Sequence, residues 1–431
     1  MSVIHIHGLY RLEGEVEIQG SKNAVLPVMA ASVLHKGTVR ISNVPEIQDV
    51  FCMMEILKLL GCVCVFRDHV LEICTEGVRP VRIPDSCCKS MRSSIMLLGP
   101  LLGRFREARV SHPGGCSIGK RPVDLHLLAL EALGARTHVE GESITAQALG
   151  LTGNRVELAF PSVGATENLL MAAAAAEGTT RVEGAAMEPE IVVLCRFLKA
   201  LGAGVRGEGT GVVEITGRKE SRGLVEFSVP GDRIVAGTYL GAVLGAGGDV
   251  VLRGAPVSQM ARVQTLVRAA GGEIWTLPGE AGLCIRQRQR ARPFSLSTGP
   301  YPRFPTDLQS VMLAVASVAD GRSQIRETVF EERFATAKEL QKMGAHIIIE
   351  DNTAYVTGRD CLEGCQVKAG DLRGGAALVV AGLAARGETV ISGYPYIRRG
   401  YEDICRDLAG LGARISLEGQ ETNCEEENGS F

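Results

Sequence analysis

The residues best suited to chemistry lie in the segment HPGGCSIGKRPVD at residues 112–124, where Cys116 precedes Lys120 and Arg121. Neighbouring cations favour the thiolate, which is the reactive form of cysteine. The glycines of this segment suit a flexible loop, and a Gly-Gly and Gly-Lys loop could instead cradle a phosphate. Its spacing, however, does not match the G-x-x-x-x-G-K-S/T pattern, and Arg121 stands where a hydroxyl residue is needed. We therefore predict a reactive cysteine in an exposed, basic loop.

Six polar clusters open six apolar, alanine-rich segments, which we expect to be helices buried on all sides because their apolar residues keep to no single stripe. The clusters are Ser21-Lys22-Asn23, Arg92-Ser93, Ser162-Val163-Gly164, Asp232-Arg233, Thr306-Asp307 and Asp371-Leu372-Arg373. Serine, threonine and aspartate are ordinary N-cap residues, but a cation at this position opposes the helix dipole. Four clusters carry one, namely Lys22, Arg92, Arg233 and Arg373. Since helix N-termini bind anions, the pattern predicts a bound anion.

A repeat of the whole chain must position these helices. An apolar helix end, a glycine and a strand recur six times, at intervals of 68 to 73 residues. The glycines, each suited to a helix C-cap, are Gly61, Gly134, Gly202, Gly271, Gly344 and Gly412. Six units divide into two α/β domains of three, the second beginning near Pro230. We expect residues 1–21 to complete the last unit, which gives domains 22–230 and 1–21 plus 231–419.

Composition excludes several classes of protein. With 431 residues the chain is too long for one core, and its 4% of aromatic residues and net charge of −3 disfavour nucleic-acid binding. Thirteen cysteines without paired CxxC spacing indicate reduced thiols and no metal site. No signal segment or membrane-length apolar run occurs. We expect a soluble cytoplasmic protein with a disordered acidic tail at 420–431.

Several motifs together resemble a known family: PGGCSIGKRPVDLHL, SKNAVLP, SVGATENLLMAA, EPEI, FPTDLQ, DLRGGAALVVAGLA and RRGYE. They are similar to those of the bacterial UDP-N-acetylglucosamine enolpyruvyl transferases (1-carboxyvinyltransferases), in order, over residues 3–418. The resemblance implies a two-domain inside-out α/β barrel, each domain built from three βαβαββ-like repeats around buried helices. It also implies transfer of the enolpyruvyl group of phosphoenolpyruvate to the 3-hydroxyl of UDP-N-acetylglucosamine, with release of phosphate and no cofactor. This is the first committed step of peptidoglycan precursor synthesis, needed for cell shape and division.

The same resemblance implies roles for individual residues. Cys116 would protonate the methylene carbon, assist phosphate release and react with fosfomycin, and Asp307 would be the base at the 3-hydroxyl. The cations that hold phosphoenolpyruvate would be Lys22, Arg92, Arg121 and Arg399. The contacts to the UDP-sugar would come from Asn23, Arg92, Arg121, Pro122, Val123, Asp124, Ser162, Val163, Gly164, Asp307 and Val329. Supporting roles fall to Asp232, Asp371 and Arg373, the last as an ion-pair partner of Asp371.

The chain departs from the family pattern at a few positions. Gln48 stands where some members have lysine, Thr336 where histidine is expected, and Gly184 and Glu332 where asparagine is common. Two alternatives therefore stay open: a catalytically weak paralogue that binds the sugar nucleotide and regulates, and 5-enolpyruvylshikimate-3-phosphate synthase, which has the same fold. Oligomeric state is left between monomer and weak dimer. We also expect the two domains to close around the sugar nucleotide, because cationic helix ends on facing domains repel one another without a ligand.

Overall fold

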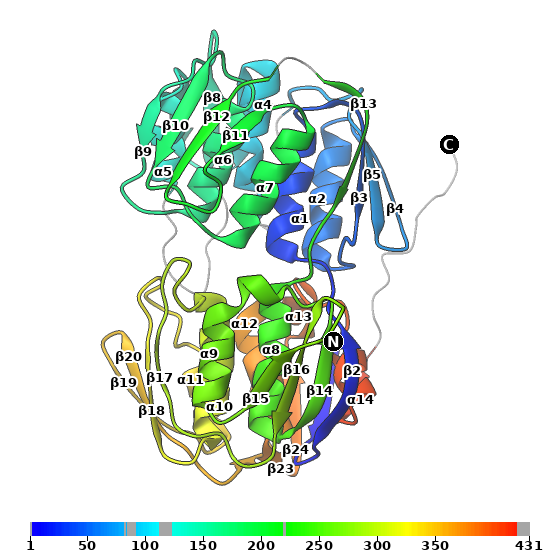
Figure 1. Cartoon of the computed structure of the whole chain (residues 1–431), viewed down its shortest axis with the longest axis vertical. Coiled ribbons are helices and arrows are strands. Elements are labelled where there is room, and N and C mark those ends of the chain that lie inside the picture. The colour runs from blue at the N-terminus through cyan, green and yellow to red at the C-terminus, as the bar shows by residue number, and fades with distance from the viewer. Residues whose placement is uncertain (1, 82, 84–91, 112–122, 219–220, 420–431) are drawn as a thin grey trace.

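The computed structural model describes residues 2–81, 83, 92–111, 123–218 and 221–419, with Arg92 and Ser93 described by their backbone alone. Cys116, Arg121, Pro122 and the tail at 420–431 lie outside this part of the chain. Two lobes stack along the long axis of the molecule (Figure 1). Residues 22–229 form the N-lobe, and residues 2–20 with 231–419 form the C-lobe, each around a separate hydrophobic core. The predicted domain boundaries stay a prediction, which these two cores support.

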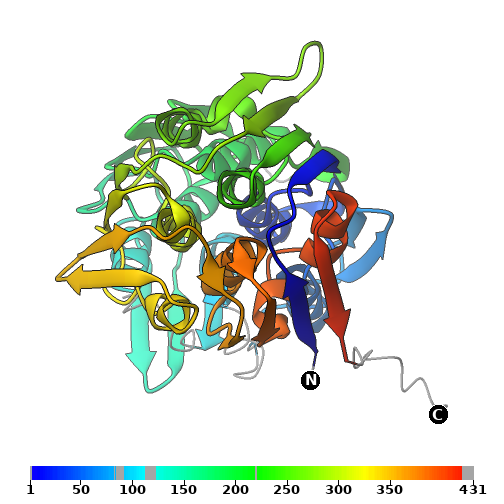
Figure 2. The same ribbon diagram turned by 90° about the horizontal axis from the view of Figure 1, so that it is seen from below.

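Each lobe places three helical columns inside and sheets outside, as Figure 2 shows for the C-lobe. The inner helices of the N-lobe are α1 (Lys22–Ser32), η1 (Arg92–Leu97) with α4 (Leu98–Phe105), and α6 (Val163–Ala173). Those of the C-lobe are α8 (Arg233–Ala246), η3 (Thr306–Leu308) with α10 (Gln309–Val318), and α12 (Leu372–Leu383). All six begin at the predicted polar clusters. The expectation of helices buried on every side is confirmed, most fully for α10, whose ten residues are all buried.

A second set of helices covers the outside of the lobes. They are α2 (Gln48–Leu59), α5 (Asp124–Glu131), α7 (Pro189–Ala200), η2 (Val257–Gln259), α9 (Ala261–Ala269), α11 (Ala337–Lys342), α13 (Tyr394–Arg398) and α14 (Ile404–Gly410). Most are amphipathic; α9, for example, buries Val263, Leu266 and Val267 and exposes the residues between them. The six repeated glycines follow α2, α5, α7, α9, α11 and α14, and all have φ between 88° and 98°. A left-handed glycine therefore ends each of these six helices, as the spacing predicts.

The strands form open sheets, and no closed hydrogen-bonded barrel occurs among the described residues. In the N-lobe the sheet orders are β13-β3-β5-β4, β9-β10-β12-β11 and β6-β8-β7. Their strands are β3 (Lys36–Ser42), β4 (Val63–Arg67), β5 (Val70–Cys74), β6 (Glu107–Ser111), β7 (Arg136–Glu140), β8 (Ser143–Gln147), β9 (Arg155–Glu157), β10 (Thr179–Glu183), β11 (Gly204–Arg206), β12 (Val212–Thr216) and β13 (Arg222–Ser228). Each four-stranded sheet joins one parallel pair to two antiparallel ones.

The C-lobe repeats this plan with sheets β22-β24-β1-β25, β2-β14-β16-β15 and β17-β18-β20-β19, and adds a short pair, β21-β23. Its strands are β1 (Val3–His7), β2 (Leu12–Glu17), β14 (Gly248–Arg253), β15 (Glu273–Thr276), β16 (Gly282–Gln287), β17 (Ser295–Ser297), β18 (Arg322–Arg326), β19 (His346–Glu350), β20 (Thr353–Thr357), β21 (Leu362–Glu363), β22 (Gln366–Lys368), β23 (Ala385–Arg386), β24 (Glu388–Ser392) and β25 (Arg414–Glu418).

The N-terminal strands join two different sheets of the C-lobe. Strand β1 lies between β24 and β25, so it completes the last unit as expected. Strand β2 pairs in parallel with β14 and completes the sheet of the fourth unit instead. The chain then crosses to the N-lobe beside its return path, where Gly20 bridges Gly231. The expectation for residues 1–21 was therefore right for β1 and wrong for β2, because the two strands diverge after Gly8.

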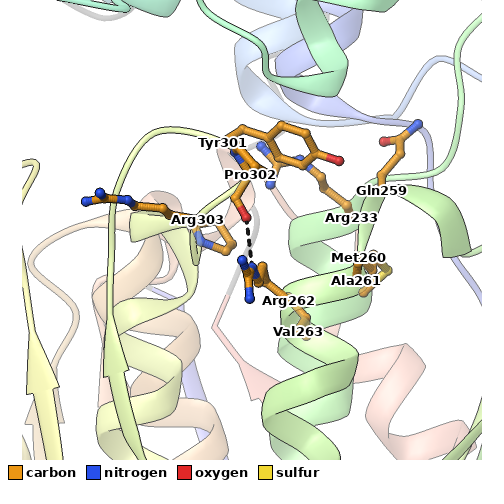
Figure 3. Close-up of a pocket in the computed structure, with 10 residues that line it drawn as sticks. Arg233, Gln259, Met260, Ala261, Arg262, Val263, Tyr301, Pro302 and Arg303 are labelled. Atoms are coloured by element: carbon orange, nitrogen blue, oxygen red, sulfur yellow. Dashed lines mark hydrogen bonds between the residues drawn. The ribbon is translucent and has the colours of Figure 1, made fainter. Parts of the chain in front are cut away.

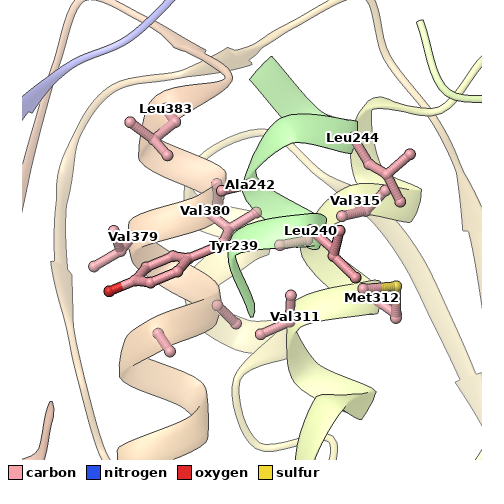
Figure 4. Packing of buried hydrophobic residues seen from close by; sticks show 14 of the residues in the cluster. Tyr239, Leu240, Ala242, Leu244, Val311, Met312, Val315, Val379, Val380 and Leu383 are labelled. Carbon is pink, nitrogen blue, oxygen red and sulfur yellow. The ribbon is translucent and has the colours of Figure 1, made fainter. Parts of the chain in front are cut away.

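The centre of the C-lobe shows why its helices approach closely (Figure 4). Tyr239 and Leu240 of α8 pack against Val311 of α10 and Val380 of α12, and all four side chains are at most 1% exposed. At Gly241 an added Cβ would lie 2.5 Å from Val311 Cγ1. The missing side chain thus lets α8 and α10 touch. This packing fixes the helix starts at the lobe boundary.

Candidate active site at the lobe boundary

The inner helices of both lobes begin at the boundary between the lobes (Figure 1). The clearest sign of their convergence joins α1 to η3: Asn23 Nδ2 lies 3.4 Å from Asp307 Oδ2. These residues are 284 positions apart in sequence and come from opposite lobes. The predicted meeting of polar helix starts is therefore seen for α1 and η3.

Lys22, the first residue of α1, is 8% exposed and contacts a carboxylate that the sequence did not single out. Its Nζ lies 2.5 Å from Asp49 Oδ2. Arg399 reaches the same carboxylate from the C-lobe, with Nε 2.9 Å from Oδ1 and Nη2 3.3 Å from Oδ2. Burial lowers the pKa of the Lys22 ammonium, Asp49 opposes this shift, and Arg373 and Arg399 add to it. Burial would raise the pKa of Asp49, but Lys22 and Arg399 outweigh it and keep this pKa below its usual value.

Asp307 lies in η3 and faces cations from the C-lobe. Arg333 Nη2 donates to Oδ1 at 3.0 Å, and Arg373 Nε lies 3.4 Å from the same oxygen. The N-cap positions of η3 and α10 are Pro305 and Leu308, so Asp307 is the N-cap residue of neither helix. Arg333 is 4% exposed and was missed from the sequence, where nothing distinguishes it from the other arginines.

Two further aspartates do cap inner helices. Asp232 accepts hydrogen bonds from the backbone of Ile234 and Val235 and, through Oδ2, from the backbone N–H of Lys22 at 3.0 Å. Asp371 caps α12 by accepting from the backbone N–H groups of Arg373 and Gly374, both at 2.9 Å. The expected side-chain ion pair between Arg373 and Asp371 is wrong, because the Arg373 guanidinium turns to Asp307.

Arg233, at the start of α8, pairs with a second acid of the facing lobe. Its Nε and Nη2 lie 2.8 Å and 3.1 Å from the two oxygens of Glu190. Glu188 Oε1 also crosses the boundary and accepts from the backbone N–H of Tyr301 at 3.1 Å. Behind them Glu167 is 1% exposed, and burial with Glu190 and Glu188 raises its pKa well above the usual range.

These pairs change the explanation of the helix-end cations. The sequence predicts that a bound anion balances them and that the lobes repel without one. In the structure Lys22, Arg233 and Arg373 each contact a carboxylate. The pair of Arg233 with Glu190 and a further pair, Arg399 with Asp49, join the lobes. The acids come from the outer helices α2 and α7 and from η3. Reasoning from the cations of the inner helices alone missed the two acids of α2 and α7, Asp49 and Glu190.

Several of the predicted UDP-sugar contacts that the structure describes lie at two places. Ser162 caps α6 through the backbone of Ala165, at 3.4 Å. Val123 and Asp124 start α5, and an added Cβ at Gly164 would lie 2.9 Å from His126 Cε1, so the starts of α5 and α6 are adjacent. On the C-lobe, Val329 donates from its backbone to Glu327, whose other oxygen accepts from Thr306 Oγ1 next to Asp307.

Known proteins resemble this chain over nearly its whole length. Residues 6–408 match the profile of EPSP synthase (3-phosphoshikimate 1-carboxyvinyltransferase). The chain belongs to this family of enolpyruvyl transferases. It is 44% identical, over 95% of its length and 98% of the other chain, to a protein named UDP-N-acetylglucosamine 1-carboxyvinyltransferase 2 from Carboxydothermus hydrogenoformans. It is 45% identical, over 95% and 98%, to the UDP-N-acetylglucosamine 1-carboxyvinyltransferase of Cellvibrio japonicus.

Solved structures agree on the fold of this transferase. The enolpyruvyl transferase NikO from Streptomyces tendae superimposes with a TM-score of 0.87 at 25% identity, over 97% of this chain and 99% of the other. An EPSP synthase from Acinetobacter baumannii gives 0.72 at 19% identity, over 97% and 100%, and shows the fold alone. The expected fold class is thereby confirmed, with the sheets open as described above.

Three residues that depart from the transferase pattern, Gln48, Thr336 and Gly184, have different surroundings. Gln48 is exposed at the first position of α2, next to Asp49. Thr336 is 6% exposed, and its Oγ1 would lie 2.5 Å from a Cβ added at Gly374, beside the capping carboxylate of Asp371. Gly184 has φ of 70° and leaves no room for a Cβ, which would lie 2.3 Å from the carbonyl oxygen of Leu158.

A small pocket of about 70 Å³ lies beside the site on the C-lobe (Figure 3). Its lining residues are Arg233, Gln259, Met260, Ala261, Arg262, Val263, Tyr301, Pro302, Arg303 and Pro305. None of them is a predicted substrate contact. Within the described residues no cluster of His, Cys, Asp and Glu is arranged to hold a metal. No helix in that part of the chain has both the length and the apolar surface needed to cross a membrane.

Proposed function

We propose that this transferase moves the enolpyruvyl group of phosphoenolpyruvate to the 3-hydroxyl of UDP-N-acetylglucosamine and releases phosphate. One observation carries the proposal: Asn23 and Asp307 meet across the lobe boundary, beside the cations Lys22 and Arg399. An acid–base group and a cationic patch for a small dianion are thus adjacent. The choice of acceptor rests on relatives that share 43–45% of their residues with this chain and carry that activity in their names.

The chemistry requires a base, an acid and cations. The 3-hydroxyl oxygen attacks C2 of phosphoenolpyruvate and loses its proton, while the methylene carbon C3 gains one. Because the product keeps the vinyl group, that added proton must leave again as the bond from C2 to the phosphate oxygen breaks. Asp307 is proposed to take the hydroxyl proton, and Cys116 to exchange the proton at C3. Lys22 and Arg399, with Arg92 and Arg121, are proposed to hold the carboxylate and phosphate.

The sugar nucleotide is proposed to lie along the starts of α5 and α6. The free N–H groups at the start of α6, which include Val163 and Gly164, suit its diphosphate. Val123, Asp124 and Pro122 are proposed to hold the uridine, and Val329 with Asn23 the sugar. The reaction would take place in the cytoplasm and supply peptidoglycan synthesis, which is how the enzyme would serve cell shape and division.

Phosphate release tests the proposal against its two rivals. We expect purified protein to release phosphate from phosphoenolpyruvate with UDP-N-acetylglucosamine. Turnover with shikimate 3-phosphate alone would instead favour the synthase, and tight binding of the sugar nucleotide without turnover would favour a regulatory paralogue.

Variants at Cys116 test its proposed role separately. Aspartate is also an acid, so Cys116→Asp should still release phosphate but should no longer be labelled by fosfomycin. Cys116→Ser should also escape labelling. Labelling of the serine variant at the wild-type rate would reject the assignment of this cysteine.

A further inference from the structure

Asp49 stands out because one buried carboxylate joins two cations from opposite lobes. Lys22 comes from the start of α1 in the N-lobe, and Arg399 follows α13 in the C-lobe. Their side-chain nitrogens lie 2.5 Å, 2.9 Å and 3.3 Å from the oxygens of Asp49. The residue is only 2% exposed, so water does little to screen these contacts. The carboxylate of Asp49 therefore binds Lys22 within its own lobe and Arg399 in the other lobe.

The position of Asp49 explains how two like charges come together. Lys22 opposes the dipole of α1, and Arg373 adds a third positive charge from the start of α12. Asp49 lies in the first turn of α2, where a helix dipole favours a negative charge. Without it, the buried ammonium of Lys22 and the half-buried guanidinium of Arg399 would repel each other.

We propose that Asp49 is a positioning residue for the transfer reaction, holding Lys22 and Arg399 together across the lobe boundary in the arrangement that receives phosphoenolpyruvate. The inference deepens the proposed function and rests on it, since it takes these two cations as the phosphoenolpyruvate site. One carboxylate against two cations leaves a net positive charge. Asp49 thus unites the cations and still leaves them attractive to a dianion.

The pH profile distinguishes positioning from mere structural support. The charged groups that face Lys22 among the described residues are Asp49 on α2, Arg399 after α13, Arg373 on α12, and Asp232, which binds its backbone. Asp49 raises the pKa of Lys22, while burial and the two arginines lower it. Removing the charge of Asp49 therefore lowers this pKa further. The ammonium then loses its proton at a lower pH, and activity should decline earlier on the alkaline side.

The test compares Asp49→Asn and Asp49→Glu with the wild-type enzyme. We expect Asp49→Asn to raise KM for phosphoenolpyruvate about 30-fold. This factor corresponds to the low end of the free-energy cost of losing one partner of a buried charge pair. KM for the sugar nucleotide should change much less, and the alkaline limb of kcat/KM should move to lower pH. Asp49→Glu should leave the alkaline limb of the kcat/KM profile at its wild-type pH. Glu55→Gln, which removes an exposed carboxylate from the same helix, is the matched control and should change neither quantity.

A second readout needs no turnover. Acylation of the Lys22 amine, followed by mass spectrometry across a pH series, reports its pKa in each variant. Asp49→Asn should make Lys22 reactive at lower pH, and Asp49→Glu should not. An unchanged labelling profile and unchanged KM in Asp49→Asn would overturn the inference, even if the variant melts earlier. If Asp49→Asn does not fold, a shifted labelling profile in Asp49→Glu would overturn it as well. A wild-type protein that never releases phosphate would instead reject the proposed function. The acylation profile of Lys22 would still show whether Asp49 sets the pKa of that amine.

Discussion

The two oxygens of Asp307 have different surroundings. Oδ1 contacts Arg333 and Arg373, while Oδ2 faces Asn23 of the opposite lobe. The arginines orient the carboxylate, and Oδ2 points to the helix start where the sugar is proposed to bind. If this carboxylate is the base, as proposed, its orientation directs it to a group at the boundary, so its geometry matters as much as its basicity.

Replacing Asp307 by asparagine should separate binding from catalysis. The amide keeps the shape and can still accept a hydrogen bond from Arg333, but it is not a base. We expect kcat to fall about 10²- to 10⁴-fold, with the dissociation constant of the sugar nucleotide within a few-fold of wild type by calorimetry. Asp320→Asn removes an exposed carboxylate near Arg290 and serves as control. A variant that retains full kcat would exclude Asp307 as the base.

Glu167 should give the protein a measurable pH dependence. Its pKa is raised in the folded state by burial and by Glu190 and Glu188. The folded state therefore holds a proton that the unfolded chain releases above about pH 4.3, so this contribution to stability is present at lower pH and is lost as pH rises through the folded pKa.

Glu167→Gln isolates that contribution, because glutamine keeps the shape and carries no charge. In urea denaturation between pH 5 and pH 8, the free energy of unfolding of the wild type should fall relative to that of the variant as pH rises. Parallel curves for the two proteins would show that Glu167 does not carry the raised pKa.

Among the elements, α8 offers a matched pair of glycines. A Cβ at Gly241 would lie 2.5 Å from Val311 Cγ1, whereas one at Gly245 would lie 3.7 Å from Val380 Cγ1, an ordinary contact. Gly241→Ala should therefore destabilise the protein by about 1–3 kcal/mol through overpacking. Gly245→Ala should stabilise it by about 0.5–1 kcal/mol through helix propensity. Thermal and urea unfolding measure both, and equal effects would contradict the close approach of α8 and α10.

Elements were the part of the fold best predicted from sequence. The starts of α1, α6, α8 and α12 follow from Ser, Asp, Lys and Arg beside alanine-rich runs, and the outer-helix ends from glycines such as Gly61. These features are local, so neighbouring residues determine them. The pairing of Arg233 with Glu190 is not local, because α7 and α8 meet only when the lobes fold together. Asp49 was missed for the same reason.

At the scale of the whole molecule, ion pairs replace the repulsion expected between the lobes. Arg233 with Glu190 and Arg399 with Asp49 link them without a ligand. We therefore expect small-angle scattering of the free protein to give a radius of gyration close to that of the compact structure. Glu188→Gln with Glu190→Gln should increase it, and saturating sugar nucleotide should reduce it again. Glu72→Gln, in an exposed pair with Arg40, is the control. An extended wild-type protein would show that these pairs form only with ligand.

The placement of β1 and β2 has a consequence for how the protein is made. These strands leave the ribosome before the N-lobe, yet β1 pairs with β24 and β25, which are synthesised after all the other described strands. At roughly 5–20 residues per second, about 20–80 s separate them. Among the described residues, the core of the N-lobe draws only on side chains between Ala24 and Val229, so this lobe can fold during translation while β1 and β2 ahead of it wait unpaired. An unpaired strand edge invites aggregation, so we expect residues 3–17 to need protection by a chaperone during synthesis.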